Sequence, residues 1–172
     1  MNAIGAVLFI WLALAGPNRL AIARPADELT DKVPVGVLTV YTGTKSYNSG
    51  NILYFPHTTY AIYHENGNFY RYVKNRTTPT DETPYTILIP SGRYFILAQS
   101  EKQGRVKFPI AIDPGRIATI RLDDPNRKHI PRDSHEIRLK NGSVAGWHWS
   151  RRAPQKYFER GVLIDLFGWK IQ

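Results

Sequence analysis

Histidines are the side chains of this chain with the greatest potential for catalysis or metal binding. No two of them stand at the spacing of a helical or zinc-ribbon site, and the complete absence of cysteine excludes thiolate ligands and thiol nucleophiles. His57 and His64 would meet Glu65 if neighbouring strands brought them together, which leaves a hydrolase with an unrecognised site as one hypothesis. The five histidines are His57, His64, His129, His135 and His148.

Sequence motifs of other enzyme and metal sites are missing too. The chain has no G-x-S-x-G elbow, no S-x-x-K and no glycine-rich phosphate loop. Asp123 and Asp124 offer carboxylate oxygens to calcium, but two carboxylates without further oxygen ligands nearby are more typical of a solvated turn. We therefore expect a protein that is not an enzyme and that has neither a cofactor nor a metal site.

Positive charge and tryptophan are concentrated at the C-terminal end. The chain has 23 Lys and Arg residues against 14 Asp and Glu residues, a net charge of +9. Residues 24–124 contain 12 basic and 10 acidic residues, whereas residues 125–172 contain 10 and 4, together with every tryptophan outside the N-terminal apolar run. This end is predicted to contact a phosphate-rich envelope polymer or anionic lipid, with indoles at a membrane interface or stacked on sugars. The predicted contact residues are Arg138, Lys140, Trp147, Trp149, Arg151, Arg152 and Lys156.

The N-terminus is predicted to be a signal peptide. The apolar run 3–15 is shorter than the roughly 20 residues that span a bilayer, and Ala21-Ile22-Ala23 offers the small residues that signal peptidase accepts. Cleavage after Ala23 would leave a secreted or periplasmic chain without a transmembrane span, and export disfavours nucleic acid as a partner. An uncleaved N-terminal anchor is the alternative, because no Lys or Arg precedes the apolar run.

Short strands are the elements expected to position these residues. Asn66-Gly67 between two aromatic runs predicts a β-hairpin, and Pro90-Ser91-Gly92 predicts a second one. Pro109 places its strand at a sheet edge or beside a bulge, because proline cannot donate a ladder hydrogen bond. Residues 51–55 fit a strand or a loop, 75–84 an exposed connection, and 157–172 a strand or a short helix. The predicted strands cover residues 36–41, 60–64, 69–73, 85–89, 93–99, 105–112, 117–122, 136–139 and 143–149.

Strands at this spacing, with turn residues between them, predict an all-β fold. The expected architecture is an antiparallel immunoglobulin-like sandwich with a short C-terminal β-hairpin extension. The predicted domains are a signal peptide at 1–23, a linker at 24–34, the sandwich at 35–122 and a basic C-terminal extension at 123–172.

One part of the predicted sandwich carries a recognisable pattern. The stretches TILIPSGRY (86–94), FPIAIDPGR (108–116) and IRL (120–122) join apolar strands through a Pro-x-Gly-x-Tyr turn and a glycine turn. This pattern resembles carboxypeptidase regulatory-like and PEGA-type modules, and the chain is similar to small exported bacterial proteins built around one such sandwich. The resemblance implies a transthyretin-like fold and a non-catalytic role as an appendage or envelope-binding domain.

These observations predict a non-catalytic exported protein that associates with the cell envelope or an envelope protein through its basic C-terminal segment. A carbohydrate-binding module that uses surface tyrosines and tryptophans is a second hypothesis. Alternatively, the tryptophans pack on the sandwich or on a neighbouring subunit, the tyrosines pair across strands, and the basic side chains are only solvated. The clustered tyrosines are Tyr54, Tyr60, Tyr63, Tyr70 and Tyr72.

Overall fold

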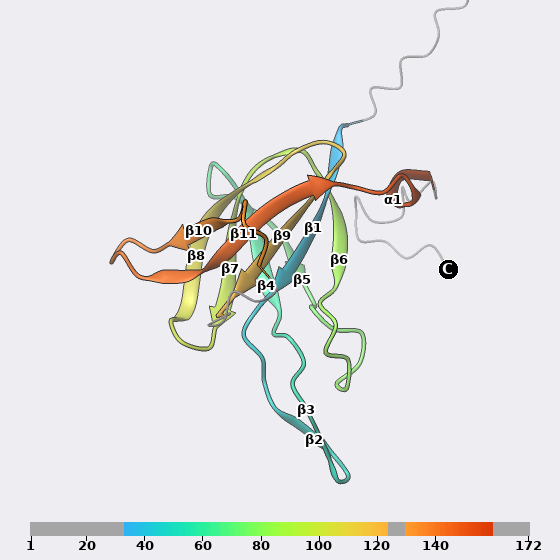
Figure 1. Ribbon diagram of the computed structural model, residues 1–172, viewed down its shortest axis with the longest axis vertical. Helices are drawn as coiled ribbons and strands as arrows, with labels where there is room; N and C mark the ends of the chain where they lie inside the picture. The colour runs from blue at the N-terminus through green and yellow to red at the C-terminus, as the bar shows by residue number, and fades with distance from the viewer. Residues whose placement is uncertain (1–32, 124–129, 160–172) are drawn as a thin grey trace, which may run out of the picture. The chain divides into compact units, whose positions relative to one another are not determined.

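The computed structural model describes residues 33–123 and 130–159. The predicted signal peptide, residues 24–32, 124–129 and 160–172, and with them Trp169, lie outside the described residues, so cleavage after Ala23 stays a prediction. Within the described residues the chain is all-β apart from the short helix α1 (Lys156–Glu159), and its strands form three sheets (Figure 1). No helix in this part of the chain is long and apolar enough to cross a membrane.

The largest sheet has five strands in the order β10-β11-β9-β1-β6. β1 pairs with β9 in parallel, and every other neighbouring pair in this sheet is antiparallel. A parallel pair needs a long connection, and here the whole second sheet lies between β1 and β9 in the chain. The strands are β1 (Val35–Tyr41), β6 (Thr86–Pro90), β9 (Arg116–Leu122), β10 (His135–Arg138) and β11 (Val144–Arg152).

The second sheet is antiparallel and has four strands in the order β5-β4-β7-β8. It confirms two sequence predictions. Gly67, with a φ of 86°, lies in the turn between β4 and β5. Pro109 lies in β8, an edge strand of this sheet, where proline is tolerated. The strands are β4 (Tyr60–His64), β5 (Phe69–Val73), β7 (Gly92–Ser100) and β8 (Gly104–Ile112).

The third sheet is a small hairpin between β1 and β4 in the chain. It consists of β2 (Tyr47–Ser49) and β3 (Ile52–Tyr54), which pair only with each other. Gly50 has a φ of 64° in the connecting turn, a conformation that glycine adopts without steric strain. The segment 51–55, which the sequence left open between a strand and a loop, therefore contains a strand.

The two larger sheets pack as a β-sandwich around one hydrophobic cluster. Leu38 and Ile120 from the five-stranded sheet and Ile96 from the four-stranded sheet belong to it, and each is completely buried. Burial of apolar surface contributes about 25 cal/mol per Å², so this core is the main source of the scaffold's stability. The period-two prediction for β8 is confirmed, since all its inward positions are buried, namely Val106, Phe108, Ile110 and Ile112.

The predicted hairpin at Pro90-Ser91-Gly92 is wrong. β6 pairs with β1, whereas β7 pairs with β4 and β8, so the turn carries the chain from one sheet to the other. The Tyr94 hydroxyl donates to the Pro90 carbonyl at 2.9 Å and holds this corner. Proline and glycine set the local turn geometry, but the partner of each strand depends on contacts far away in the sequence.

The connection between β5 and β6 was predicted to be exposed over residues 75–84, and this is wrong at its first and last residues. Pro84 is buried, and Asn75 is completely buried. Its Nδ2 donates to the Val40 carbonyl at 2.6 Å, and its Oδ1 accepts a hydrogen bond from the Tyr85 backbone N–H at 2.9 Å. The side chain thus fastens the connection to β1, and the other residues of 75–83 are exposed or half-buried.

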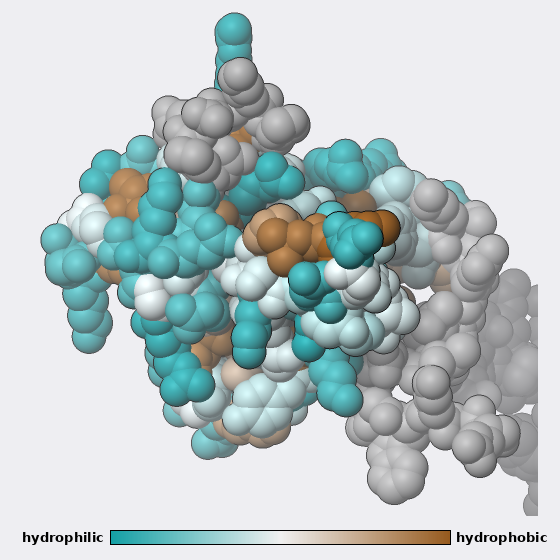
Figure 2. Space-filling view, turned by 90° about the horizontal axis from the view of Figure 1, so that it is seen from below, coloured by the Kyte–Doolittle hydropathy of each residue, from teal (hydrophilic) through white to brown (hydrophobic). Residues whose placement is uncertain are grey.

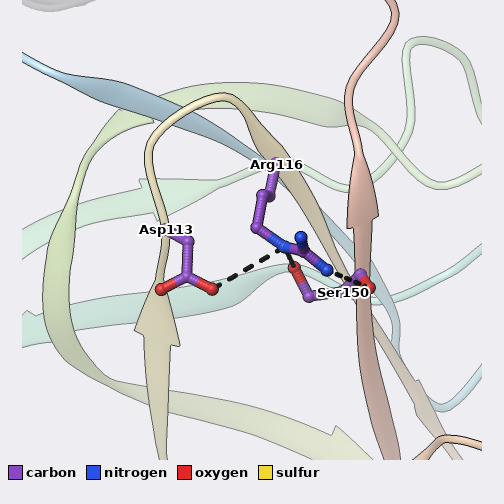
Figure 3. Close-up of polar contacts among 3 residues, drawn as sticks. All are labelled: Asp113, Arg116 and Ser150. Carbon is purple, nitrogen blue, oxygen red and sulfur yellow. Dashed lines mark hydrogen bonds and ion pairs between the residues drawn. The ribbon is translucent and has the colours of Figure 1, made fainter.

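The predicted C-terminal hairpin is confirmed, and it forms part of the five-stranded sheet. β11 is longer than predicted and pairs with β9 from Gly146↔Leu122 to Arg152↔Arg116. The Arg116 guanidinium strengthens this pairing, because it donates to the Ser150 Oγ and carbonyl oxygen, both at 2.9 Å, and lies 3.8 Å from the Asp113 carboxylate (Figure 3). The sandwich therefore continues across the predicted boundary at residue 122.

Candidate functional site

The candidate site lies on the outer face of the five-stranded sheet, opposite the hydrophobic core. Strand residues alternate between the two faces, and the inward positions of β9 are Ala118, Ile120 and Leu122, as predicted. Thr119 therefore points to the outer face, beside the residues that pair with it on the two neighbouring strands. The strand register places four side chains in one row across β11, β9, β1 and β6, in the order Trp149, Thr119, Thr39 and Thr86.

This row forms the floor of a groove of about 350 Å³. The Thr39 and Thr86 hydroxyls are hydrogen-bonded to each other at 2.8 Å, so one of them donates and the other keeps its own proton for a further partner. Arg151 contributes an exposed guanidinium to the lining. The groove has a volume near the lower end of the range for ligand pockets. Its aromatic lining consists of Tyr41, Trp149 and Tyr157.

The chain after β11 turns back and supplies one wall of this groove. The Ala153 N–H donates to the Gly115 carbonyl at 2.9 Å, which ties the end of β11 to the β8–β9 turn. Ala153 then packs with Val37 and Ile117 in a small apolar cluster, and Tyr157 of α1 packs against it. Because these contacts lie on the outer face of the sheet, Tyr157 is held beside the threonine row.

A second cavity of about 360 Å³ adjoins the groove, and Tyr41 lines both. The Arg121 guanidinium carbon lies 4.4 Å from the centre of the Tyr41 ring, within cation–π distance. The His57 ring meets the same tyrosine edge-on, with centroids 5.5 Å apart and planes at 89°. Glu82 and Glu101 also line the cavity.

The polar side chains of this second cavity mainly form hydrogen bonds with backbone groups of the protein. His57 Nδ1 lies 2.6 Å from the Thr42 carbonyl oxygen, and Glu101 accepts hydrogen bonds from the Thr44 hydroxyl at 2.7 Å and backbone N–H at 3.0 Å. Burial lowers the pKa of His57, so the ring is neutral at pH 7. The Thr44 hydrogen bonds lower the pKa of Glu101, so this carboxyl group is ionised. A general acid needs a raised carboxyl pKa, and Glu101 has the opposite.

The histidine grouping considered from the sequence is not formed. The His64 ring lies 5.0 Å from the Tyr70 ring and 5.5 Å from the Tyr94 ring, centre to centre, and His64 does not line the cavity that contains His57. Glu65 pairs instead with Arg93, at 3.4 Å on the surface. The structure therefore gives no support to a hydrolase built on these three residues.

The carboxylate of Asp123 is likewise occupied by the protein itself. It accepts hydrogen bonds from the Ser100 hydroxyl at 2.6 Å and from the backbone N–H groups of Glu101 at 2.7 Å and Lys102 at 3.2 Å. These bonds support the left-handed conformation of Asp123, whose φ is 62°. Among residues 33–123 and 130–159, no three His, Cys, Asp or Glu side chains group in a way that would hold a metal ion.

The predicted contact residues do not form one surface. Trp149 and Arg151 line the groove, whereas Arg138 and Lys140 lie at the turn end of the β10–β11 hairpin. Arg138 donates there to the Gly142 carbonyl and pairs with Glu136. At about 3.3 Å per residue, the two ends of β11 are roughly 26 Å apart.

Trp147, Arg152 and Lys156 are the remaining predicted contact residues. Trp147 lies in the row of the sheet next to the threonine row, and the other two lie at or after the end of β11 that borders the groove. Trp147 is half-buried and stands opposite Arg121 of β9. Arg152 is exposed and stands opposite Arg116. Lys156 begins α1, and its side chain lies outside what the structure describes. Both tryptophans that the structure describes are therefore partly exposed.

Sequence reasoning missed the threonine row and Tyr41. The only trace of them in the sequence is the alternation of polar and apolar residues, in which Thr39 and Tyr41 take the polar positions of one strand and Thr119 and Arg121 those of another. Every half-buried strand shows such positions, so alternation alone does not reveal which of them share a row. Comparison with known proteins found no match, whether to a protein-family model, a curated protein or a solved structure.

Proposed function

We propose that the protein is a non-catalytic, exported binding protein that holds an anionic glycan of the cell envelope in the groove on its five-stranded sheet. The observation that carries this proposal is the composition of the groove. It combines aromatic rings with a row of threonine hydroxyls and the guanidinium of Arg151.

The chemistry of such a ligand matches each part of the lining. The apolar faces of sugar rings stack on aromatic side chains, which here would be Trp149, Tyr41 and Tyr157. Sugar hydroxyls exchange hydrogen bonds with threonine hydroxyls, and a carboxylate or phosphate on the glycan pairs with Arg151 through a charge-assisted hydrogen bond. An excess of positive charge in the whole chain favours the approach of such a polymer.

The proposal includes a transthyretin-like type of sandwich and a location outside the cytoplasm. The resemblance of residues 86–122 to carboxypeptidase regulatory-like and PEGA-type modules supports a transthyretin-like sandwich, which in those families is a non-catalytic module. The apolar run at 3–15 and the small residues at Ala21 and Ala23 support export to the periplasm or the cell surface.

A charge-matched pair of variants tests the proposal. Arg151→Gln removes a guanidinium that lines the groove, whereas Arg138→Gln removes the same charge at the far end of the hairpin. Binding of polygalacturonate oligosaccharides, followed by isothermal titration calorimetry, should weaken about five- to tenfold in Arg151→Gln and remain nearly unchanged in Arg138→Gln. A neutral maltooligosaccharide serves as the ligand control.

Two results would contradict the proposal. If both variants weaken binding equally and salt abolishes it, the glycan is attracted by diffuse charge alone and the groove has no special role. If no anionic glycan binds while the variants unfold at the same temperature as the wild type, the groove is not a glycan site.

A further inference from the structure

The β2–β3 hairpin exposes apolar side chains that neither the core nor the groove uses. The exposed fractions are 57% for Ile52, 54% for Leu53, 46% for Phe55 and 40% for Tyr47. The hairpin lies beyond the two larger sheets in Figure 1, and Figure 2, which looks from that end, shows apolar surface surrounded by hydrophilic residues. Clustered exposed apolar residues of this kind mark interaction sites.

The root of this hairpin is held firmly, although its strands pair with no strand of the two larger sheets. The Lys45 N–H donates to the Pro56 carbonyl at 3.1 Å, which closes the root. Glu101 accepts two hydrogen bonds from Thr44, and Glu82 accepts one from the Phe55 N–H. A two-stranded hairpin on its own is only marginally stable in water, so these contacts keep the apolar residues in a fixed, presented position.

Both faces of the hairpin are apolar. Ile52 and Leu53 are neighbours in one strand, so their side chains point to opposite faces, and each is more than half exposed. Their cross-strand partners, Ser49 and Asn48, are polar and too short to cover them. A flat protein surface would cover one face only, whereas the hydrocarbon of a bilayer closes around both.

The aromatic residues and the lysine of the hairpin match the layers of a bilayer interface, whereas the turn at residues 48–51 is polar and limits insertion to that interface. Aliphatic side chains at 52 and 53 are flanked by Tyr47 and Phe55, and aromatic rings prefer the boundary between acyl chains and headgroups. Lys45 is the only charged residue between positions 44 and 56, and it is exposed. The carboxylates of Glu82 and Glu101 at the root already accept hydrogen bonds from the backbone of Phe55 and Thr44, whereas Lys45 offers a cation to anionic headgroups.

We propose that the β2–β3 hairpin inserts shallowly into an anionic phospholipid bilayer, with Ile52 and Leu53 at the acyl-chain boundary and Lys45 at the headgroups. The hairpin thereby anchors the described domain at the membrane surface. This surface is separate from the groove, so either assignment stands or falls without the other.

Because the chain contains no cysteine, a single introduced cysteine reports on one position. The environment-sensitive dye NBD is attached to Leu53→Cys and, as a control, to Ala111→Cys. Ala111 is exposed on β8 and pairs with Arg93 at the beginning of β7. The root of the β2–β3 hairpin lies near the other end of β7, because the Gly43 N–H donates to the Gln99 carbonyl. The labelled full-length chains are mixed with vesicles of equal parts phosphatidylglycerol and phosphatidylcholine, and with phosphatidylcholine vesicles.

We expect NBD at position 53 to brighten and shift to the blue with the anionic vesicles, and to be quenched by a spin label placed high on the acyl chain. NBD at position 111 should keep its emission in water. The readout is local, so membrane binding by the apolar run 3–15 does not mimic it. Adding Ile52→Ser to the labelled chain should weaken the response about tenfold.

The following outcomes would overturn the proposal. Unchanged emission at position 53 in the presence of bound vesicles would show that the hairpin stays in water. Equal changes at positions 53 and 111 would show adsorption without a preferred orientation. A blue shift at position 53 that grows with protein concentration in the absence of vesicles would show that a second copy of the chain covers the hairpin.

Discussion

The side-chain amide of Asn75 is expected to contribute strongly to the stability of the sandwich, and Asn75→Ala tests this. The residue is completely buried, donates to the Val40 carbonyl at 2.6 Å and accepts from the Tyr85 N–H at 2.9 Å. Alanine removes both bonds, together with a longer one from Nδ2 to the Thr42 hydroxyl oxygen at 3.3 Å. A buried polar group that loses its partner costs about 1–3 kcal/mol, so the free energy of unfolding should fall by about 2–6 kcal/mol.

The nearly isosteric variant Asn75→Asp separates the two hydrogen bonds. Aspartate still accepts from the Tyr85 N–H, but its second oxygen faces the Val40 carbonyl oxygen, where the native amide donates. Burial beside an acceptor favours the protonated carboxyl, so the pKa of this aspartate in the folded protein should exceed its unfolded value of about 3.9. The unfolded chain then ionises first, and the destabilisation relative to the wild type should grow as the pH rises above about 4.

Urea unfolding monitored by tryptophan fluorescence measures both effects. The wild type and the two variants are compared at a series of pH values, so that the pH dependence common to all three cancels. A loss of less than about 1 kcal/mol in Asn75→Ala would refute the structural role assigned to this side chain. A penalty for Asn75→Asp that is the same at acidic and neutral pH would refute the assigned geometry.

Two further predictions concern stability. Burial lowers the pKa of His57 and His148 below the usual 6.5, so the unfolded chain binds protons more readily and the free energy of unfolding should fall as the pH drops through about 6.5. Urea titrations between pH 5 and pH 8 check this, and equal slopes for the wild type and His57→Gln would contradict it for His57. Gly146→Ala should destabilise by roughly 1–3 kcal/mol, because the new Cβ would clash with the Arg121 carbonyl oxygen. An unchanged midpoint of thermal unfolding would show that β11 and β9 can move apart to accommodate the methyl group with little loss of stability.

Much of the secondary structure was predictable because it depends on local patterns. The alternation in β8 identifies its buried face, and the Asn66-Gly67 turn identifies the β4–β5 hairpin. The partners of the strands depend on contacts distant in sequence. The parallel pairing of β1 with β9 and the change of sheet after Pro90 therefore left no local signal. Asn75 was missed for the same reason, since its polar side chain in a polar segment resembles any exposed asparagine.

The candidate site was predictable only in part. Trp149 and Arg151 were selected because aromatic and basic residues are concentrated near the C-terminus, and both line the groove. The same criterion selected Arg138, which lies at the far end of the hairpin, because composition does not reveal which end of a strand approaches which neighbour. The threonine row depends on the register of four strands, three of which lie outside the basic segment.

Chemical-shift mapping by NMR tests the central claim most directly. Polygalacturonate oligosaccharides are titrated into the ¹⁵N-labelled protein, and the backbone amide shifts are followed residue by residue. A glycan held in the groove should produce its largest shifts at Thr39, Thr86, Thr119 and Trp149, the row that the strand register assembles. Shifts concentrated around Arg138 at the turn of the β10–β11 hairpin, or spread evenly over basic residues, would contradict the account.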